Sequence, residues 1–123
     1  MLPWNIVEAA KAPDGTDLLL ARRGTEWEVR AGGHTLMSNR THGSEMALAR
    51  LAFERVPEAK RVLLGGLGLG FSLRATLDLL PPDGRIVLAE LSPALLRWNR
   101  EHVGELAGNP LQDARVQVSV VDV

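Results

Sequence analysis

Residues 61–90 read RVLLGGLGLGFSLRATLDLLPPDGRIVLAE, and this stretch decides the fold. An apolar run at residues 62–64 leads into residues 66–70, in which glycine alternates with leucine, and a helical pattern begins directly at Phe71. A second apolar run then ends in Glu90. A short apolar run that ends in glycines is typical of a parallel strand buried on both faces. The stretch therefore predicts a strand, a glycine turn, a helix and a second strand.

The glycine turn and the acid that follows it together predict a nucleoside site. Glycines let the backbone turn tightly and approach a ligand closely, because they carry no Cβ. The helix after the turn offers free N–H groups and the positive end of its dipole. Glu90 follows Gly70 by about twenty residues, at the expected tip of the second strand, where nucleotide-binding βαβ units bind ribose hydroxyls. A tight turn beside a solvated glutamate is the structural alternative.

The spacing of the glycines narrows the class of nucleoside. A dinucleotide fingerprint G-x-G-x-x-G that began at Gly66 would require glycine at position 71, and that residue is Phe71. The chain instead carries G-x-G-x-G over residues 66–70. This spacing resembles the first motif of S-adenosylmethionine-dependent enzymes, whose ligand has no pyrophosphate.

The composition limits the other classes of function. The 123 residues are 46% hydrophobic and 24% charged with a net charge of −1, so no nucleic-acid or membrane surface is expected. The absence of cysteine excludes disulfides, thiolate metal sites and cysteine nucleophiles, and we expect no metal site. The N-terminus lacks the features of a signal peptide and no apolar run is long enough to span a membrane, so we expect a cytoplasmic protein.

The part of the chain before the glycine turn predicts a small antiparallel β-meander. Three short runs of apolar or alternating residues, separated by glycine-containing turns, lie at residues 18–22, 26–30 and 34–38. We assign them to an N-terminal β-meander subdomain, residues 1–40. The remainder, residues 41–123, is assigned to a nucleoside-binding α/β domain.

A helix is expected between the meander and the first parallel strand. It begins near Thr41, a plausible N-cap, and runs to about Glu54, before a proline. One face of this helix carries Leu48, Leu51 and Ala52, and we expect that face to pack against the sheet.

Two further helices and a third strand complete the predicted α/β domain. The helix after the glycine turn should bury a stripe of Leu73, Leu77 and Leu80. Ser92, followed by a proline, predicts the start of a helix that continues to about residue 106. A third strand at residues 115–121 then delivers Asp122 to its carboxyl end, on the same edge of the sheet as the glycine turn. A plain solvated carboxylate is the alternative for Asp122.

With these motifs assembled, the sequence resembles the spermidine synthase family and its spermidine synthase-like relatives. Residues 61–70 are similar to the family's basic and apolar run into a glycine-rich motif. Residues 87–91 are similar to its V-E-I segment, whose Glu binds the ribose hydroxyls. Residues 113–116 and 121–122 are similar to its D-P-R-V and G-D segments, where the Asp contacts the adenine amino group. The resemblance implies an α/β fold: a partial doubly wound parallel sheet of the Rossmann-like S-adenosylmethionine methyltransferase type, preceded by a small antiparallel β-meander.

The same resemblance implies a ligand and a set of site residues. The ligand would be S-adenosylmethionine, decarboxylated S-adenosylmethionine or methylthioadenosine, bound as a co-substrate without a metal. Glu90 would bind the ribose and Asp122 the adenine, while the glycine turn lets the backbone approach the ligand. The expected cofactor-binding residues are Gly65, Gly66, Leu67, Gly68, Gly70, Glu90, Leu91 and Asp122.

Departures from the family pattern leave the reaction open. Gly43 and Ser44 stand where the family has the Tyr and His of Y-H-E, which help hold the amine acceptor and the aminopropyl donor, so only Glu45 matches. Gly68 replaces the Asp that grips the donor's polar tail. No residue is assigned as catalytic, because the family's catalytic Asp follows a fourth strand that has no counterpart here. A small-molecule methyltransferase and a non-catalytic binding or assembly module therefore remain alternatives to a spermidine synthase-like transferase.

The predicted position of the first parallel strand also bears on association. The resemblance places residues 62–64 in the centre of a sheet, yet only one neighbouring strand can be assigned. The other side would expose unpaired N–H and C=O groups and apolar side chains, which favours self-association. We therefore expect either a part of a longer protein or a homo-oligomer that covers this edge.

Overall fold

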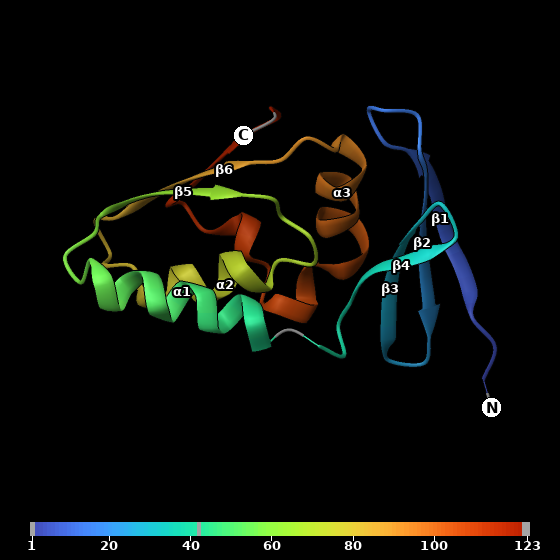
Figure 1. Cartoon of the computed structure of the whole chain (residues 1–123), viewed down its shortest axis with the longest axis horizontal. Coiled ribbons are helices and arrows are strands. Elements are labelled where there is room, and N and C mark those ends of the chain that lie inside the picture. The colour runs from blue at the N-terminus through green and yellow to red at the C-terminus, as the bar shows by residue number, and fades with distance from the viewer. Residues whose placement is uncertain (1, 42, 122–123) are drawn as a thin grey trace. The chain divides into compact units, whose positions relative to one another are not determined.

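The computed structural model describes residues 2–41 and 43–121 and divides the chain into two compact units, Met1–Thr41 and His42–Val123. Each unit contains one β-sheet, antiparallel in the first and parallel in the second (Figure 1). Within the described ranges, no helix combines the length and the apolar character that crossing a membrane requires.

The first unit is a four-stranded antiparallel meander in sequence order. Its strands are β1 (Asn5–Lys11), β2 (Asp17–Arg23), β3 (Glu26–Ala31) and β4 (His34–Ser38). The three predicted strands are confirmed, and β1 is an additional strand that the sequence pattern did not reveal. Its pairing with β2 is irregular between Ile6 and Glu8, and this bulge interrupts the alternation by which a strand is recognised. The buried side chains of this sheet are Leu18, Leu20, Ala21 and Val29.

The second unit is built on a three-stranded parallel sheet in the order β5-β6-β7. The strands are β5 (Arg61–Gly65), β6 (Arg85–Ala89) and β7 (Val116–Ser119). Three α-helices accompany them, α1 (Gly43–Arg55), α2 (Phe71–Leu79) and α3 (Pro93–Trp98). The chain continues from α3 through a π-helical turn, η1 (Asn99–Val103), and two short 3-10 segments, η2 (Gly104–Ala107) and η3 (Pro110–Gln112).

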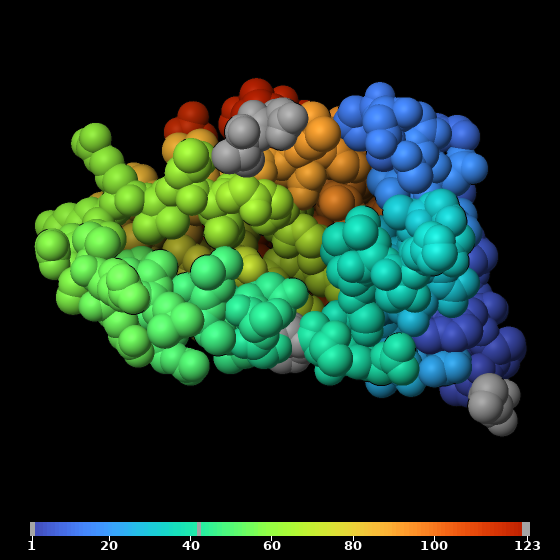
Figure 2. Space-filling view, viewed as in Figure 1, coloured from blue at the N-terminus to red at the C-terminus, as the bar shows by residue number. Residues whose placement is uncertain are grey.

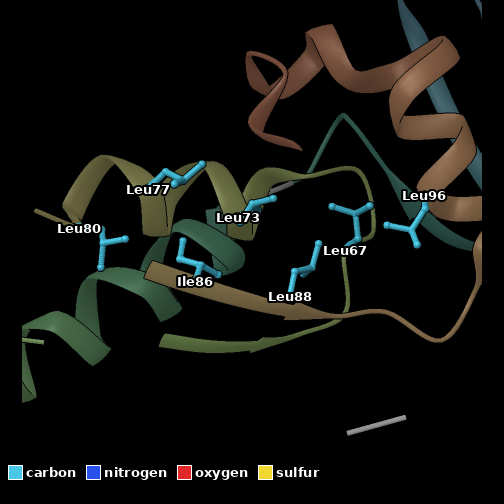
Figure 3. Close-up of a cluster of buried hydrophobic side chains, with 7 residues drawn as sticks. All are labelled: Leu67, Leu73, Leu77, Leu80, Ile86, Leu88 and Leu96. Atoms are coloured by element: carbon cyan, nitrogen blue, oxygen red, sulfur yellow. The ribbon is translucent and has the colours of Figure 1, made fainter. Parts of the chain in front are cut away.

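The core of this unit lies between the parallel sheet and α2. Figure 3 shows side chains from α2 and its C-cap, β6, the glycine turn and α3 directed into one cluster: Leu67, Leu73, Leu77, Leu80, Ile86, Leu88 and Leu96. The predicted stripe on α2 is therefore confirmed. A cluster of this kind supplies most of the stabilisation of a small domain, because each fully buried leucine contributes about 1.5–3 kcal/mol relative to an exposed one.

The prediction that β5 is buried on both faces is wrong for the part of the chain that the structure describes. Val62 and Leu64 pack against the core, but Leu63 between them is 65% exposed. In β6, Leu88 is fully buried whereas Val87 is 38% exposed. Alternation of this kind arises because helices cover only one face of the sheet.

The prediction for the face of α1 is also wrong. Leu48 and Leu51 are 65% and 55% exposed, and Ala52 is exposed as well. The residues turned inward are Ala49, which is buried, and Phe53, which packs on the core cluster. The helix packs beside α2, so its inner face is set by that neighbour and not by the sheet.

Candidate functional site

The glycine turn joins β5 to α2 at the carboxyl end of the strand. Gly66, Gly68 and Gly70 adopt positive φ angles of 86°, 56° and 90°. Leu67 and Leu69 between them are only 3% and 4% exposed. The alternating sequence therefore has two roles, since the leucines anchor the turn in the core while the glycines supply backbone angles that other residues rarely adopt.

At Gly70 the need for glycine comes from the protein itself. A Cβ there would lie 3.2 Å from Pro110 Cγ and 3.4 Å from both Ala107 Cβ and Asn99 Oδ1. At Gly66 a Cβ would meet nothing within 4 Å. Packing thus restricts Gly70, while the space beside Gly66 is open for another molecule.

Glu90, immediately after β6, contacts this turn. Its Oε1 accepts a hydrogen bond from the N–H of Leu67 at 2.8 Å, and its Oε2 accepts one from the N–H of Ser92 at 2.9 Å. The residue is only 6% exposed. A carboxylate has about four lone-pair sites, so each oxygen retains capacity for one more donor. Glu90 therefore fastens the turn to the beginning of α3 and can still accept hydrogen bonds.

The start of α3 is as the sequence predicts. Ser92 is the N-cap, and its hydroxyl accepts a hydrogen bond from the N–H of Leu95 at 3.4 Å, with Pro93 in the first turn. This cap holds the N–H of Ser92 where it can donate to Glu90. Ser92 therefore caps α3 with its hydroxyl and binds the Glu90 carboxylate with its N–H.

Asn99 is a site residue that the sequence pattern did not identify. It lies where α3 passes into η1, and its Nδ2 donates to the backbone oxygens of Gly68 and Leu95, both at 2.9 Å. Asn99 is 4% exposed. The one available signal was a polar residue of low helix propensity within an apolar helical stripe. A π-helical turn at this point agrees with the tendency of such turns to occur at functional sites.

The other predicted site residues are placed as follows. Gly65 ends β5, and the N–H of Gly66 donates to the backbone oxygen of Ala89 at 2.8 Å, which joins the tips of β5 and β6. Leu91, next to Glu90, is 47% exposed. The turn and Glu90 are therefore brought together at the carboxyl ends of two parallel strands. Asp122 lies outside the described residues.

Asp113, at the beginning of the D-P-R-V-like segment, has a structural role. Its carboxylate accepts hydrogen bonds from Arg115 Nε at 3.0 Å and Nη2 at 2.9 Å, and Arg115 Nη1 donates to the backbone oxygen of Leu80 at 2.9 Å. These bonds to Arg115 lower the pKa of Asp113 from 3.8 to about 2. The pair precedes β7, at the end of the sheet opposite the glycine turn, and ties this strand to the end of α2.

A separate groove of about 410 Å³ lies between α1 and β5. Its lining is mainly apolar and includes Leu48, Phe53, Val62 and Leu63 but neither the glycine turn nor Glu90. Figure 2 shows this hollow between the green of α1 and the yellow-green of β5. The groove is therefore a feature of the uncovered edge and not of the candidate site.

Comparison with known proteins gives matches in fold. No protein-family model and no curated protein sequence matches the chain. The similar solved structures include spermidine synthase from Thermotoga maritima and a spermidine synthase in complex with the transition state analogue AdoDATO. Each has a TM-score of 0.77 and 17% sequence identity over 95% of this chain. The aligned part is 40% of the first structure and 41% of the second, so this chain spans about two fifths of their length. The chain thus resembles spermidine synthases in fold.

Proposed function

We propose that this chain is the nucleoside-binding part of a spermidine synthase-like transferase. The ligand would be S-adenosylmethionine, decarboxylated S-adenosylmethionine or methylthioadenosine, and the three-stranded sheet would be the first part of a doubly wound methyltransferase-type sheet. Glu90 would accept hydrogen bonds from the ribose hydroxyls, and the open backbone at Gly66 would face the ligand. Asp122 would contact the adenine, as the family resemblance implies.

One observation carries this proposal. The carboxylate of Glu90 lies at the tip of β6 and is bonded to the backbone of a positive-φ glycine turn at the tip of β5. In open parallel sheets, ligands bind over the carboxyl ends of the strands, and an acid in this position binds ribose. The similarity in fold to a spermidine synthase solved with AdoDATO supports the same class of ligand.

The arrangement supports binding, and no described residue is assigned to the transfer step. Gly43 and Ser44, where the family has Tyr and His, begin α1 and carry no ionisable side chain. A methyltransferase or a non-catalytic module with the same nucleoside site therefore remains the second candidate. Product analysis separates these alternatives, because aminopropyl transfer releases methylthioadenosine whereas methyl transfer releases S-adenosylhomocysteine.

The proposal is tested by titration calorimetry with methylthioadenosine. The wild-type chain should bind, and Glu90→Ala should weaken binding by about 1–3 kcal/mol, the range for hydrogen bonds to a charged group. Glu58→Ala is the matched control, because Glu58 is exposed and precedes β5 at the end of the sheet opposite the glycine turn. Circular dichroism of each variant shows whether the fold is retained.

Two results would contradict the proposal. The first is absence of heat from the wild-type chain at millimolar methylthioadenosine. The second is unchanged affinity in a folded Glu90→Ala variant. Should Glu90→Ala fail to fold, Glu90→Gln provides the same test, since it keeps the shape of the side chain and removes its charge.

A further inference from the structure

Asn99 holds the glycine turn through its side-chain amide group. Both hydrogens of Nδ2 are used, one for the backbone oxygen of Gly68 and one for that of Leu95. The reverse orientation of the amide would place Oδ1 against two carbonyl oxygens, so hydrogen-bond chemistry fixes which atom faces them. Oδ1 is buried without a hydrogen-bond partner among the described residues, and it lies beside Gly70.

The bond to Gly68 determines the direction of the next N–H group. The chain has no cis peptide in its described part, and in a trans peptide the C=O of one residue and the N–H of the next point in opposite directions. Because the oxygen of Gly68 points to Asn99, the N–H of Leu69 points away from it. Within residues 2–41 and 43–121 this N–H has no hydrogen-bond partner.

The hydrogen bond from Asn99 is important because the residue that it holds, Gly68, has unusual conformational freedom. Glycine adopts positive and negative φ with similar ease, so the peptide between Gly68 and Leu69 could rotate if nothing held it. The φ of 56° at Gly68 is one of these alternatives. The hydrogen bond of 2.9 Å from the buried Asn99 amide to the Gly68 oxygen stabilises this conformation over the alternatives.

We propose that Asn99 is a positioning residue that fixes the peptide between Gly68 and Leu69, so that the N–H of Leu69 donates to an acceptor atom of the bound adenosine derivative. This inference rests on the proposed nucleoside-binding function. Asn99 itself does not touch the ligand in this arrangement. It acts through the backbone of the turn at Gly68, while Glu90 holds the N–H of Leu67.

The test uses Asn99→Asp, which keeps the shape of the side chain and removes both donors. We expect methylthioadenosine affinity to fall at least about tenfold, the equivalent of about 1.4 kcal/mol. We also expect the ¹H–¹⁵N resonance of Leu69 to move in the ligand-free protein. Gln112→Glu is the matched control, since it makes the same amide-to-acid change at an exposed position and should alter neither quantity.

A second variant and a wild-type measurement cover the case in which Asn99→Asp does not fold. Asn99→Ala removes both donors without a buried charge and should give the same two effects. In the wild-type protein the side-chain amide hydrogens of Asn99 should exchange slowly with solvent, because both are bonded and buried.

The outcomes separate this inference from the function on which it rests. If the wild type binds no methylthioadenosine, the proposed function fails, and the resonance of Leu69 in the ligand-free variants still decides whether Asn99 fixes the peptide. An unmoved Leu69 resonance in a folded Asn99→Ala variant would overturn the inference. Binding that stays within twofold of wild type in that variant, or rapid exchange of the Asn99 amide in the wild type, would overturn it as well.

Discussion

The two sides of β5 differ sharply in how completely they are covered. On the side of β6 and α2, Leu64 packs against the core, and the glycine turn is held by Glu90 and Asn99. The other edge of β5 has no strand neighbour among the described residues, Leu63 on the face that no helix covers is 65% exposed, and Leu48 on α1 is equally exposed; we call this region the open side. The covered side and the open side are thus separated by a single strand.

The comparison distinguishes a region that is held by hydrogen bonds and packing within the chain from a region that is exposed to solvent. The described part of the candidate nucleoside site is formed by β5, β6, the turn and the segment from α3 into η1, and hydrogen bonds from Glu90 and Asn99 hold the turn in place. On the open side, apolar side chains and a strand edge that has no partner among the described residues remain in contact with solvent. Changes on the covered side should therefore alter stability, and changes on the open side should alter association.

The largest effect is expected from Gly70→Ala on the covered side. The substitution adds a Cβ at a φ of 90° and only 3.2 Å from Pro110 Cγ, so it should lower the free energy of unfolding by about 2–4 kcal/mol. Gly15→Ala is the matched control, with a φ of 88° and no atom within 4 Å of the added Cβ, and should cost only about 1–2 kcal/mol. Urea denaturation measures both values. Equal losses would show that Gly70 is not restricted by packing.

A smaller effect is expected from Asp113→Asn, which tests the polar tie between β7 and α2. We expect a loss of about 1–2 kcal/mol at pH 7, because the pKa of Asp113 falls to about 2 when the chain folds. A carboxyl with a lowered folded-state pKa stabilises the fold above its unfolded pKa. The difference between variant and wild type should therefore shrink as the pH falls from about 4 to about 2.

The control for this variant is Asp78→Asn. The carboxylate of Asp78 accepts from Arg74 Nε at 3.1 Å but is 64% exposed, so its removal should change stability by no more than about 0.5 kcal/mol. Denaturation of the two variants from pH 7 to pH 2 gives the comparison. A loss for Asp113→Asn that persists undiminished at pH 2 would contradict the assigned ion pair.

The smallest effect on stability is expected from Leu63→Lys on the open side. Because Leu63 is exposed, the free energy of unfolding should change by no more than about 0.5 kcal/mol. We propose that the open edge promotes self-association, which a lysine there should reduce. Sedimentation velocity over a range of concentrations measures this, with Leu36→Lys as a control at a leucine of similar exposure in the first unit. A well-folded wild-type monomer at every concentration would show that the open edge does not associate.

Much of the second unit could be predicted from sequence because its signals are local. The stripe of Leu73, Leu77 and Leu80 has helical spacing, and Ser92 with Pro93 is a local start signal, so both were confirmed. The face of α1 could not be predicted in this way. Periodicity shows that a helix has an apolar face, but the residues that become buried depend on the neighbouring element.

Part of the candidate site could also be predicted from the sequence. The order of glycine turn and acid was sufficient to place Glu90 beside the turn, because parallel strands end at the same edge of a sheet. The contact of Asn99 with Gly68 spans 31 residues and depends on where η1 leaves α3, and no spacing rule predicts it. Strand β1 was missed for a related reason, since its bulge conceals the pattern of a strand.

The two hydrogen bonds of Glu90 also bear on the rate at which a ligand would associate. One carboxylate holds both the N–H of Leu67 and the N–H of Ser92, so the protein's own hydrogen bonds fix the backbone at both positions. A visiting adenosine derivative would not have to order a loose loop, and little conformational entropy would be lost on association. Encounter would then be governed by diffusion and orientation, with residence time as the quantity that distinguishes one derivative from another.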